Sequence, residues 1–140
     1  ELETFTRRGG SLLVSGAYVA SDMLDDKRDN ESRLFINNVL RCHLAGTYDG
    51  QNDAISGLGT SMQFYHQLND QHYAATRTDI LAPLAPAFAT MLYGNGNAAC
   101  VAYKGSDYRT ITMGFPFECI KGEKKQGVVM RALARFLLKN

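Results

Sequence analysis

The sequence has no tryptophan, only three prolines and only three cysteines among its 140 residues. So few cysteines exclude a small scaffold stapled by several disulfide bonds, and the stability must come from a hydrophobic core. Cys42, Cys100 and Cys119 cannot all pair with one another, and none belongs to a C-x-x-C motif. We expect buried free thiols, with one disulfide bond as the alternative in an oxidising compartment.

Neither sign of charge dominates, because 15 Lys and Arg stand against 14 Asp and Glu. A basic stripe interleaved with aromatic residues is absent from the sequence, so a nucleic-acid partner lacks its electrostatic signal. The apolar runs are all far shorter than the roughly 20 residues that span a bilayer. We therefore expect no nucleic-acid partner and no membrane span.

The length and composition are typical of a single domain. With 45% hydrophobic residues and no low-complexity linker, residues 1–140 have enough apolar surface for one core. The first eight residues, ELETFTRR, have the pattern of the end of a helix, and the chain begins with Glu1. We therefore expect one α/β domain that is a fragment of a larger multidomain chain.

The first third of the chain alternates between helix and strand patterns. Gly9 and Gly10 follow the first helix, and residues 11–15 form a short apolar run of the buried-strand type. Residues 16–22 leave that strand, and a helix is predicted over residues 30–41. A strand followed by a helix favours an α/β layered fold.

The remaining two thirds contain strand patterns and one long helix. Strands are predicted over residues 42–48, 61–67 and 88–93, and the turn sequence GNGN at 94–97 predicts a hairpin over 88–103. Residues 109–115 should pair with the strand before them. Two prolines favour an ordered loop over residues 78–86. Apolar residues at helical spacing predict an amphipathic helix from Glu123 to Lys139 that covers the sheet.

Two strings, GGSLLVSG at 9–16 and TMGFPFE at 112–118, resemble the C-terminal half of the class I glutamine amidotransferase-like fold. Longer strings, GGSLLVSGAYVASDM, YAATRTDILAP and NGNAACVAYKGSDYRTITMGFPFECI, resemble the C-terminal region of secreted bacterial proteins named xanthan lyase or golvesin-like. The resemblance implies a three-layer, flavodoxin-like fold with a mostly parallel sheet and an antiparallel hairpin near its C-terminal end. It also implies an extracytoplasmic or secreted location.

The resemblance argues against catalysis by this fragment. Amidotransferases carry a cysteine between two glycines after the first of these strands, where this chain has Gly16, Ala17 and Tyr18. A glutamate, Glu118, follows the late strand, but no histidine does, so the Cys, His and Glu triad is absent. The resemblance therefore implies a non-catalytic accessory or structural module of a polysaccharide-directed protein, with other domains of that protein, and polysaccharide, as partners.

An enzyme with a different site is the first alternative. Open α/β sheets bind ligands beyond the carboxyl ends of their strands, which points to the loops after Ser15 and after Phe115. Tyr18, Ser21, Asp22 and Glu118 supply the candidate ligand-binding groups there. Asp22 or Glu118 would serve as the general base of a hydrolase or lyase if it were buried. Otherwise Asp22 caps a local turn and Glu118 caps the final helix region.

Two further predictions concern ligands. His43, His66 and His72 lack metal-ligand spacing, so we expect no metal site and no cofactor, and we interpret them as surface or strand-edge residues. Exposed tyrosine rings could stack on sugars, although most are expected to be half-buried strand residues. The second alternative is a protein-protein docking domain, which predicts an exposed apolar patch. The tyrosines considered are Tyr48, Tyr65, Tyr73, Tyr93, Tyr103 and Tyr108.

Overall fold

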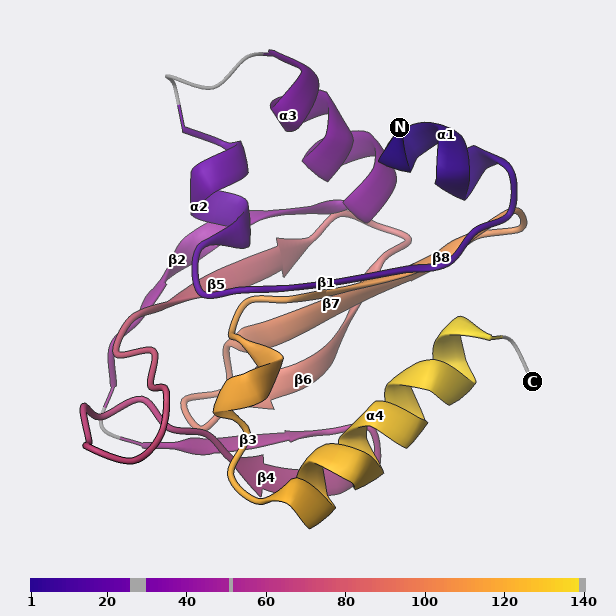
Figure 1. The fold of residues 1–140 in the computed structure, drawn as a ribbon. Coiled ribbons are helices and arrows are strands. Elements are labelled where there is room, and N and C mark those ends of the chain that lie inside the picture. Colours follow the sequence, from indigo (N-terminus) through magenta and orange to yellow (C-terminus); the bar gives the residue numbers. More distant parts are fainter. Residues whose placement is uncertain (26–29, 51, 139–140) are drawn as a thin grey trace.

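The structure is a computed structural model that describes residues 1–25, 30–50 and 52–138. A six-stranded mixed sheet with the order β1-β8-β7-β6-β3-β4 curls into a half-barrel (Figure 1). A separate antiparallel pair, β2-β5, lies beside it. The strands are β1 (Leu12–Ser15), β2 (Cys42–Tyr48), β3 (Ala54–Gly57), β4 (Thr60–Gln63), β5 (Thr78–Pro83), β6 (Phe88–Tyr93), β7 (Ala98–Lys104) and β8 (Arg109–Met113).

Helices lie on both sides of the large sheet (Figure 1). The helix α4 (Glu123–Leu137) runs along one face, and it confirms the predicted C-terminal amphipathic helix, although the last residue of that prediction, Lys139, lies outside the described residues. Within the part of the chain that is described, no helix is both long and apolar enough to cross a membrane. The other helices are α1 (Leu2–Arg7), α2 (Val19–Met23), α3 (Asn30–Phe35), the π-helical turn η1 (Ile36–Leu40) and the 3-10 turn η2 (Phe117–Cys119).

The prediction of a mostly parallel, amidotransferase-like and flavodoxin-like sheet is wrong. Only β1 and β8 pair in parallel, and the other described pairs of the large sheet are antiparallel. The reason lies in the connections, because parallel neighbours need a long crossover whereas short turns join antiparallel neighbours. The strand-helix pattern at the N-terminus therefore describes one edge of the sheet and not the whole of it.

Two short turns set the antiparallel order. The predicted hairpin is confirmed as β6-β7, with the Tyr93 N–H donating to the Asn97 carbonyl oxygen at 2.8 Å. A second hairpin, β3-β4, which the sequence pattern did not reveal in full, turns at Leu58 and Gly59. Both of these residues have positive φ, 54° and 76°, as a two-residue type I′ turn requires.

The prediction of a loop over residues 78–86 is also wrong, because its first part is strand β5. Proline removes a backbone donor, which disfavours it inside a ladder. Pro83 is the last residue of β5 and pairs with Cys42, the first residue of β2. The proline therefore stands at the margin of the ladder, where its missing N–H does not interrupt the pairing of the other residues.

The core has two parts, one on each face of the large sheet. Strand β7 separates them, because Cys100 and Ala102 face one cluster while Val101 faces the other. The larger cluster lies towards α4 and includes Val129 and Leu133 of that helix. Burial on both faces explains the nearly continuous apolar run of β7, which a half-exposed strand would not need.

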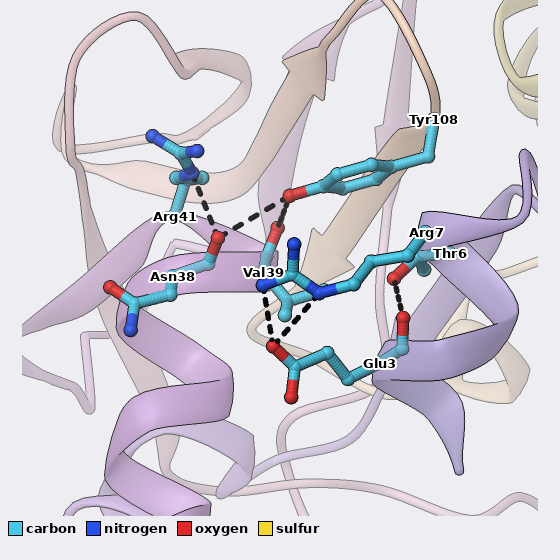
Figure 2. A network of polar contacts seen from close by, with 7 residues as sticks. All are labelled: Glu3, Thr6, Arg7, Asn38, Val39, Arg41 and Tyr108. Carbon is cyan, nitrogen blue, oxygen red and sulfur yellow. Dashed lines mark hydrogen bonds and ion pairs between the residues drawn. The ribbon is translucent and has the colours of Figure 1, made fainter.

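Polar contacts tie the end of η1 to the loop between β7 and β8 (Figure 2). The last carbonyls of a helix lack partners within the helix, and here the Tyr108 hydroxyl lies 3.3 Å and 3.1 Å from those of Asn38 and Val39. The Arg41 Nε–H donates to the Asn38 carbonyl at 2.9 Å, and Arg41 itself ends the helix with a left-handed φ of 60°. The loop between β7 and β8 is thereby tied to the end of η1.

Candidate functional site

The carboxyl ends of β1 and β8 lie side by side because these strands are parallel. The loops that follow them meet there, and the Phe117 N–H faces the Ser15 Oγ at 3.4 Å. This edge of the sheet is where the sequence placed its candidate ligand-binding groups.

The predicted groups lie on two different elements. Tyr18 precedes α2, Ser21 and Asp22 lie on α2, and Glu118 lies on η2. Tyr18, Asp22 and Glu118 are exposed, whereas Ser21 is half-buried. An exposed carboxylate lacks the desolvated surroundings that activate a general base. A catalytic role for Asp22 or Glu118 stays a prediction.

A different carboxylate, Asp79 on β5, is buried at this edge, with a relative exposure of 1%. Its Oδ2 accepts the Ser21 N–H of α2 at 2.9 Å, and its own N–H lies 3.0 Å and 3.2 Å from the carbonyl oxygens of Ala17 and Gly114. The buried Tyr93 hydroxyl lies 2.8 Å from the Asp79 carbonyl oxygen and 2.8 Å from the Thr78 Oγ1. We call this set of contacts around Asp79 the strand-end junction.

Burial governs the electrostatics of the junction. Desolvation raises the pKa of the Asp79 carboxyl, and the hydrogen bonds from Ser21 and Ala20 offset that rise only in part. The same cause raises the pKa of the Tyr93 hydroxyl. Since the contacts of Asp79 are made with protein groups that hold α2 and β8 in place, its chemistry here is structural: it supplies the polar partner of the α2 backbone.

The three cysteines are buried free thiols, which confirms the first of the two predictions made from the sequence. Desolvation raises the pKa of Cys42 to about 12 and that of Cys119 to about 11. It also raises the pKa of Cys100. Because the thiolate is the reactive form of cysteine, these thiols are unsuited to nucleophilic work at neutral pH.

A cavity of about 320 Å³ opens at the other end of the sheet, beyond β4. We call it the Tyr65 pocket. Its volume lies at the lower end of the range usual for small-ligand sites. The residues that line it are Asp53, Phe64, Tyr65, His66, Gln67, Leu68, Asn69, Gln71, His72 and Lys121.

The backbone brings these residues together by extending β4 past its last strand residue. Phe64 forms an isolated bridge to Ile120, the Tyr65 N–H donates to the Cys119 carbonyl at 2.8 Å, and the Lys121 N–H donates to the Gln63 carbonyl at 2.8 Å. The residues after Tyr65 then loop outward and return at Ala75, whose N–H donates to the Tyr65 carbonyl at 3.0 Å. Residues 66–72 therefore form a closed loop above the end of the sheet.

Aromatic rings form one wall of the Tyr65 pocket. The rings of Tyr65 and His72 are stacked, with centroids 4.3 Å apart and planes 10° apart. The Lys121 Nζ lies 5.1 Å from the centroid of the Tyr65 ring, within the range of a cation–π contact. His72 is exposed and Tyr65 is half-buried, so the stacked pair lies at the surface of the protein.

His66 is the unusual residue of the pocket. Its side chain is only 3% exposed, it stacks on Phe64 with centroids 4.8 Å apart, and its Nε2 has no hydrogen-bond partner among the described residues. A buried polar atom without a partner costs about 1–3 kcal/mol. The prediction that the histidines lie at the surface or at strand edges is therefore wrong for His66, although His43 and His72 are exposed.

One ion pair sets the charge of the pocket. The Lys121 Nζ donates to the Asp53 Oδ2 at 2.8 Å, and this hydrogen bond is the main cause that lowers the pKa of the Asp53 carboxyl. Asp53 thus stays ionised and paired. Its contribution to stability is present above the ordinary carboxyl pKa of 3.8 and is lost as the pH falls through the lowered value.

Of the tyrosines named from the sequence, only some are available to a ligand. Tyr48 and Tyr93 are buried and stacked on each other, with centroids 4.3 Å apart, whereas Tyr73 is 59% exposed. Tyr65, Tyr103 and Tyr108 are half-buried. Among the described residues, no group of three or more His, Cys, Asp or Glu side chains is placed to hold a metal ion.

Three solved structures have a similar fold over a part of their length. A GH42 β-galactosidase matches with a TM-score of 0.63 and 12% identity, covering 96% of this chain and 18% of that one. A polyextremophilic β-galactosidase from the Antarctic haloarchaeon Halorubrum lacusprofundi matches with a TM-score of 0.60 and 14% identity, covering 96% and 19%. A cold-adapted β-galactosidase from Rahnella sp. R3 matches with a TM-score of 0.57 and 14% identity, covering 96% and 20%.

These likenesses establish the fold, because the identities are too low to carry residue roles. The chain spans about a fifth of the length of each β-galactosidase. No family model and no curated protein matches the sequence. The fold of this chain is thus one that also occurs as a segment of larger carbohydrate-active enzymes.

Proposed function

We propose that the chain is a non-catalytic accessory domain of a carbohydrate-active protein. The observation that carries this proposal is the likeness of 96% of the chain to a segment that makes up only 18–20% of three β-galactosidases. A fold that recurs as a minor part of such enzymes is suited to a supporting role beside a catalytic domain. Function resides in sites and not in folds, so the sites of this chain must support the same conclusion.

The carboxylates of the chain favour an accessory role over catalysis. Glycoside hydrolysis generally requires two carboxyl groups flanking the scissile bond, one of which holds a proton. In the Tyr65 pocket, Asp53 is ionised and paired with Lys121. At the strand ends, Asp79 is engaged by the backbone of α2, while Asp22 and Glu118 are exposed. None of these arrangements resembles an acid and a base facing one substrate.

The resemblance to secreted, polysaccharide-directed proteins completes the proposal. It supports an extracytoplasmic location, with polysaccharide and the other domains of the same protein as partners. The Tyr65 pocket is the place in this chain where a saccharide would find both aromatic and hydrogen-bonding groups.

Incubation of the chain with 4-nitrophenyl β-galactoside and with soluble galactan tests the proposal. We expect no release of nitrophenol or reducing sugar above the buffer control, together with retarded migration of the chain in native gels that contain galactan. Turnover that disappears in Asp22→Asn or Glu118→Gln would contradict the proposal and establish the enzyme alternative.

A docking domain is the second candidate, and an exposed apolar surface favours it. Leu2 and Phe5 of α1 and Leu34 of α3 have relative exposures of 50%, 51% and 49%. Helices α1 and α3 lie at the same end of the molecule (Figure 1). Another domain of the same protein would bury these side chains. If galactan does not slow the migration of the chain in native gels and the chain does not hydrolyse galactosides, docking is the better account.

A further inference from the structure

We propose that the Tyr65 pocket is a saccharide-binding site that takes one neutral hexose residue of a glycan. This inference rests on the proposed function and adds the site and the class of ligand to it. Four features of the pocket carry it: an aromatic surface, a buried nitrogen without a partner, a loop braced by its own side chains, and a balanced charge.

The aromatic surface suits the apolar face of a sugar ring. Stacking on Tyr65 at 4.3 Å holds the His72 ring in a fixed plane, and His72 is exposed. Amphipathic aromatic rings offer contact area and a polar edge at a small cost in side-chain entropy. A pyranose ring has the complementary form, with C–H groups on its faces and hydroxyls around its rim.

The Nε2 of His66 has no hydrogen-bond partner among the described residues and almost no solvent-accessible surface, so a ligand reaches it only after the residues that cover it move. Buried polar side chains nearly always have a hydrogen-bond partner, and an exception in a pocket points to a missing ligand or water. Here the ring is held by Phe64 at 4.8 Å and by Tyr48 at 6.0 Å, so it cannot swing out to solvent without breaking core packing. A ligand hydroxyl that displaces the covering groups can either donate to this Nε2 or accept from it, whichever tautomer is present.

The loop over the pocket is braced by Asn69. The Asn69 Oδ1 accepts the N–H of Gln71 at 3.0 Å and that of His72 at 2.7 Å, and its Nδ2 donates to the Gln67 carbonyl at 3.2 Å. These contacts occupy the Asn69 amide and fix the path of the loop. The side chains of Gln67 and Gln71 remain exposed at the rim, where amides can hydrogen-bond to sugar hydroxyls.

The charges of the pocket favour a neutral ligand. Lys121 is paired with Asp53 at 2.8 Å, so the cation that would attract a phosphate or a carboxylate is already compensated. Apart from the two histidines, the ionisable side chains of opposite sign in the lining are Asp53 and Lys121, one of each. A nucleotide or an acidic peptide would have to break the Asp53–Lys121 pair, whereas a neutral sugar leaves it intact.

Isothermal titration of the chain with methyl β-galactoside and methyl β-glucoside tests the inference. We expect saturable binding of at least one of the two sugars, weakened about tenfold or more in His72→Ala. The control is His43→Ala, which removes another exposed histidine, on β2, and should bind as the unmodified chain does. Substitution His66→Leu should abolish binding while leaving the thermal midpoint unchanged or raised, because it removes the unpartnered nitrogen.

The outcomes separate this inference from the proposed function. Equal affinity in the unmodified chain, His72→Ala and His66→Leu would overturn the pocket assignment while leaving a carbohydrate-directed domain in place. Absence of binding to both sugars and to galactan would overturn the two proposals together. If His66→Leu fails to fold, the ratio of the dissociation constants of His72→Ala and His43→Ala decides the assignment alone. A lower midpoint in a folded His66→Leu that still binds would mean that water, and not ligand, satisfies the nitrogen.

Discussion

Replacing Gly114 by alanine is expected to lower the free energy of unfolding by about 3 kcal/mol, the upper end of the usual cost of overpacking. A Cβ at this position would lie 2.5 Å from the carbonyl oxygen of Asp79 and 3.2 Å from that of Ala99. Both obstacles are backbone atoms, so no side-chain rotation relieves the clash. The same glycine donates its N–H to Ala99 at 2.7 Å and accepts the Asp79 N–H at 3.2 Å, and a shift would weaken both bonds.

Urea unfolding of Gly114→Ala beside Gly127→Ala measures this effect. Gly127 lies within α4, where a Cβ would meet only the far end of Arg131 at 3.6 Å. Alanine in a helix is favoured over glycine by about 1 kcal/mol, so this control should be stabilised. A decrease of less than about 1 kcal/mol in the free energy of unfolding of Gly114→Ala would contradict this expectation. It would show that the strand-end junction can relax and that β5 and β8 are less tightly held than their contacts indicate.

Replacing Asp79 by asparagine is expected to lower the free energy of unfolding by about 1 kcal/mol at low pH, where the carboxyl is protonated and its hydrogen bonds join neutral groups. The amide oxygen can still accept the Ser21 N–H, but the amide NH₂ brings a second N–H donor into a buried site where the protonated carboxyl has a single O–H and an oxygen that accepts. Helix α2 should loosen first, because Asp79 is the side chain that its Ser21 N–H bonds to.

The pH dependence follows from the direction of the pKa shift. Burial raises the pKa of Asp79, so the folded chain holds this proton to higher pH than the unfolded chain does. The stabilising contribution of the protonated carboxyl is therefore complete below the ordinary value of 3.8 and decreases as the pH rises through the raised value. The cost of Asp79→Asn should accordingly shrink as the pH increases across this interval.

Unfolding curves of both proteins at a series of pH values between about 3 and 7 test this expectation. Subtracting one series from the other cancels the opposite trend of Asp53, whose stabilising ion pair is lost at low pH. If the free energy that Asp79→Asn loses relative to the unmodified chain grows with increasing pH, the account is contradicted. The ionised carboxylate would then be the stabilising form.

Local patterns in the sequence were sufficient to predict the elements whose pairing partners are near in the chain. The turn at 94–97 predicts β6-β7, and the apolar spacing after Glu123 predicts α4. The overall sheet could not be predicted from local patterns, because β1-β8, the one parallel pair among the described strands, joins residues almost a hundred positions apart. The strand-helix pattern in the first third of the chain is typical of a parallel fold. The short turns later in the chain make the remaining strand pairs antiparallel.

The two sites differ in how much of them the sequence revealed. The edge formed by the ends of β1 and β8 could be anticipated, but Asp79 was hidden in a stretch that Pro83 and Pro86 made resemble a loop. The Tyr65 pocket was missed because Asp53, His66 and Lys121 are distant in sequence and meet only through the pairing of residues 63–65 with 119–121. The one available signal was the run of amides and histidines between Tyr65 and Tyr73.

Mapping of backbone amide chemical shifts during titration with methyl β-galactoside tests the central claim most directly. The account predicts that the largest shifts occur at the Tyr65 pocket, in residues 64–72 and at Asp53 and Lys121, while the strand-end junction around Asp79 is unchanged. Shifts concentrated instead at residues 15–22 and 114–118 would contradict it, because the ligand would then lie beside Asp22 and Glu118, where the enzyme alternative places its site.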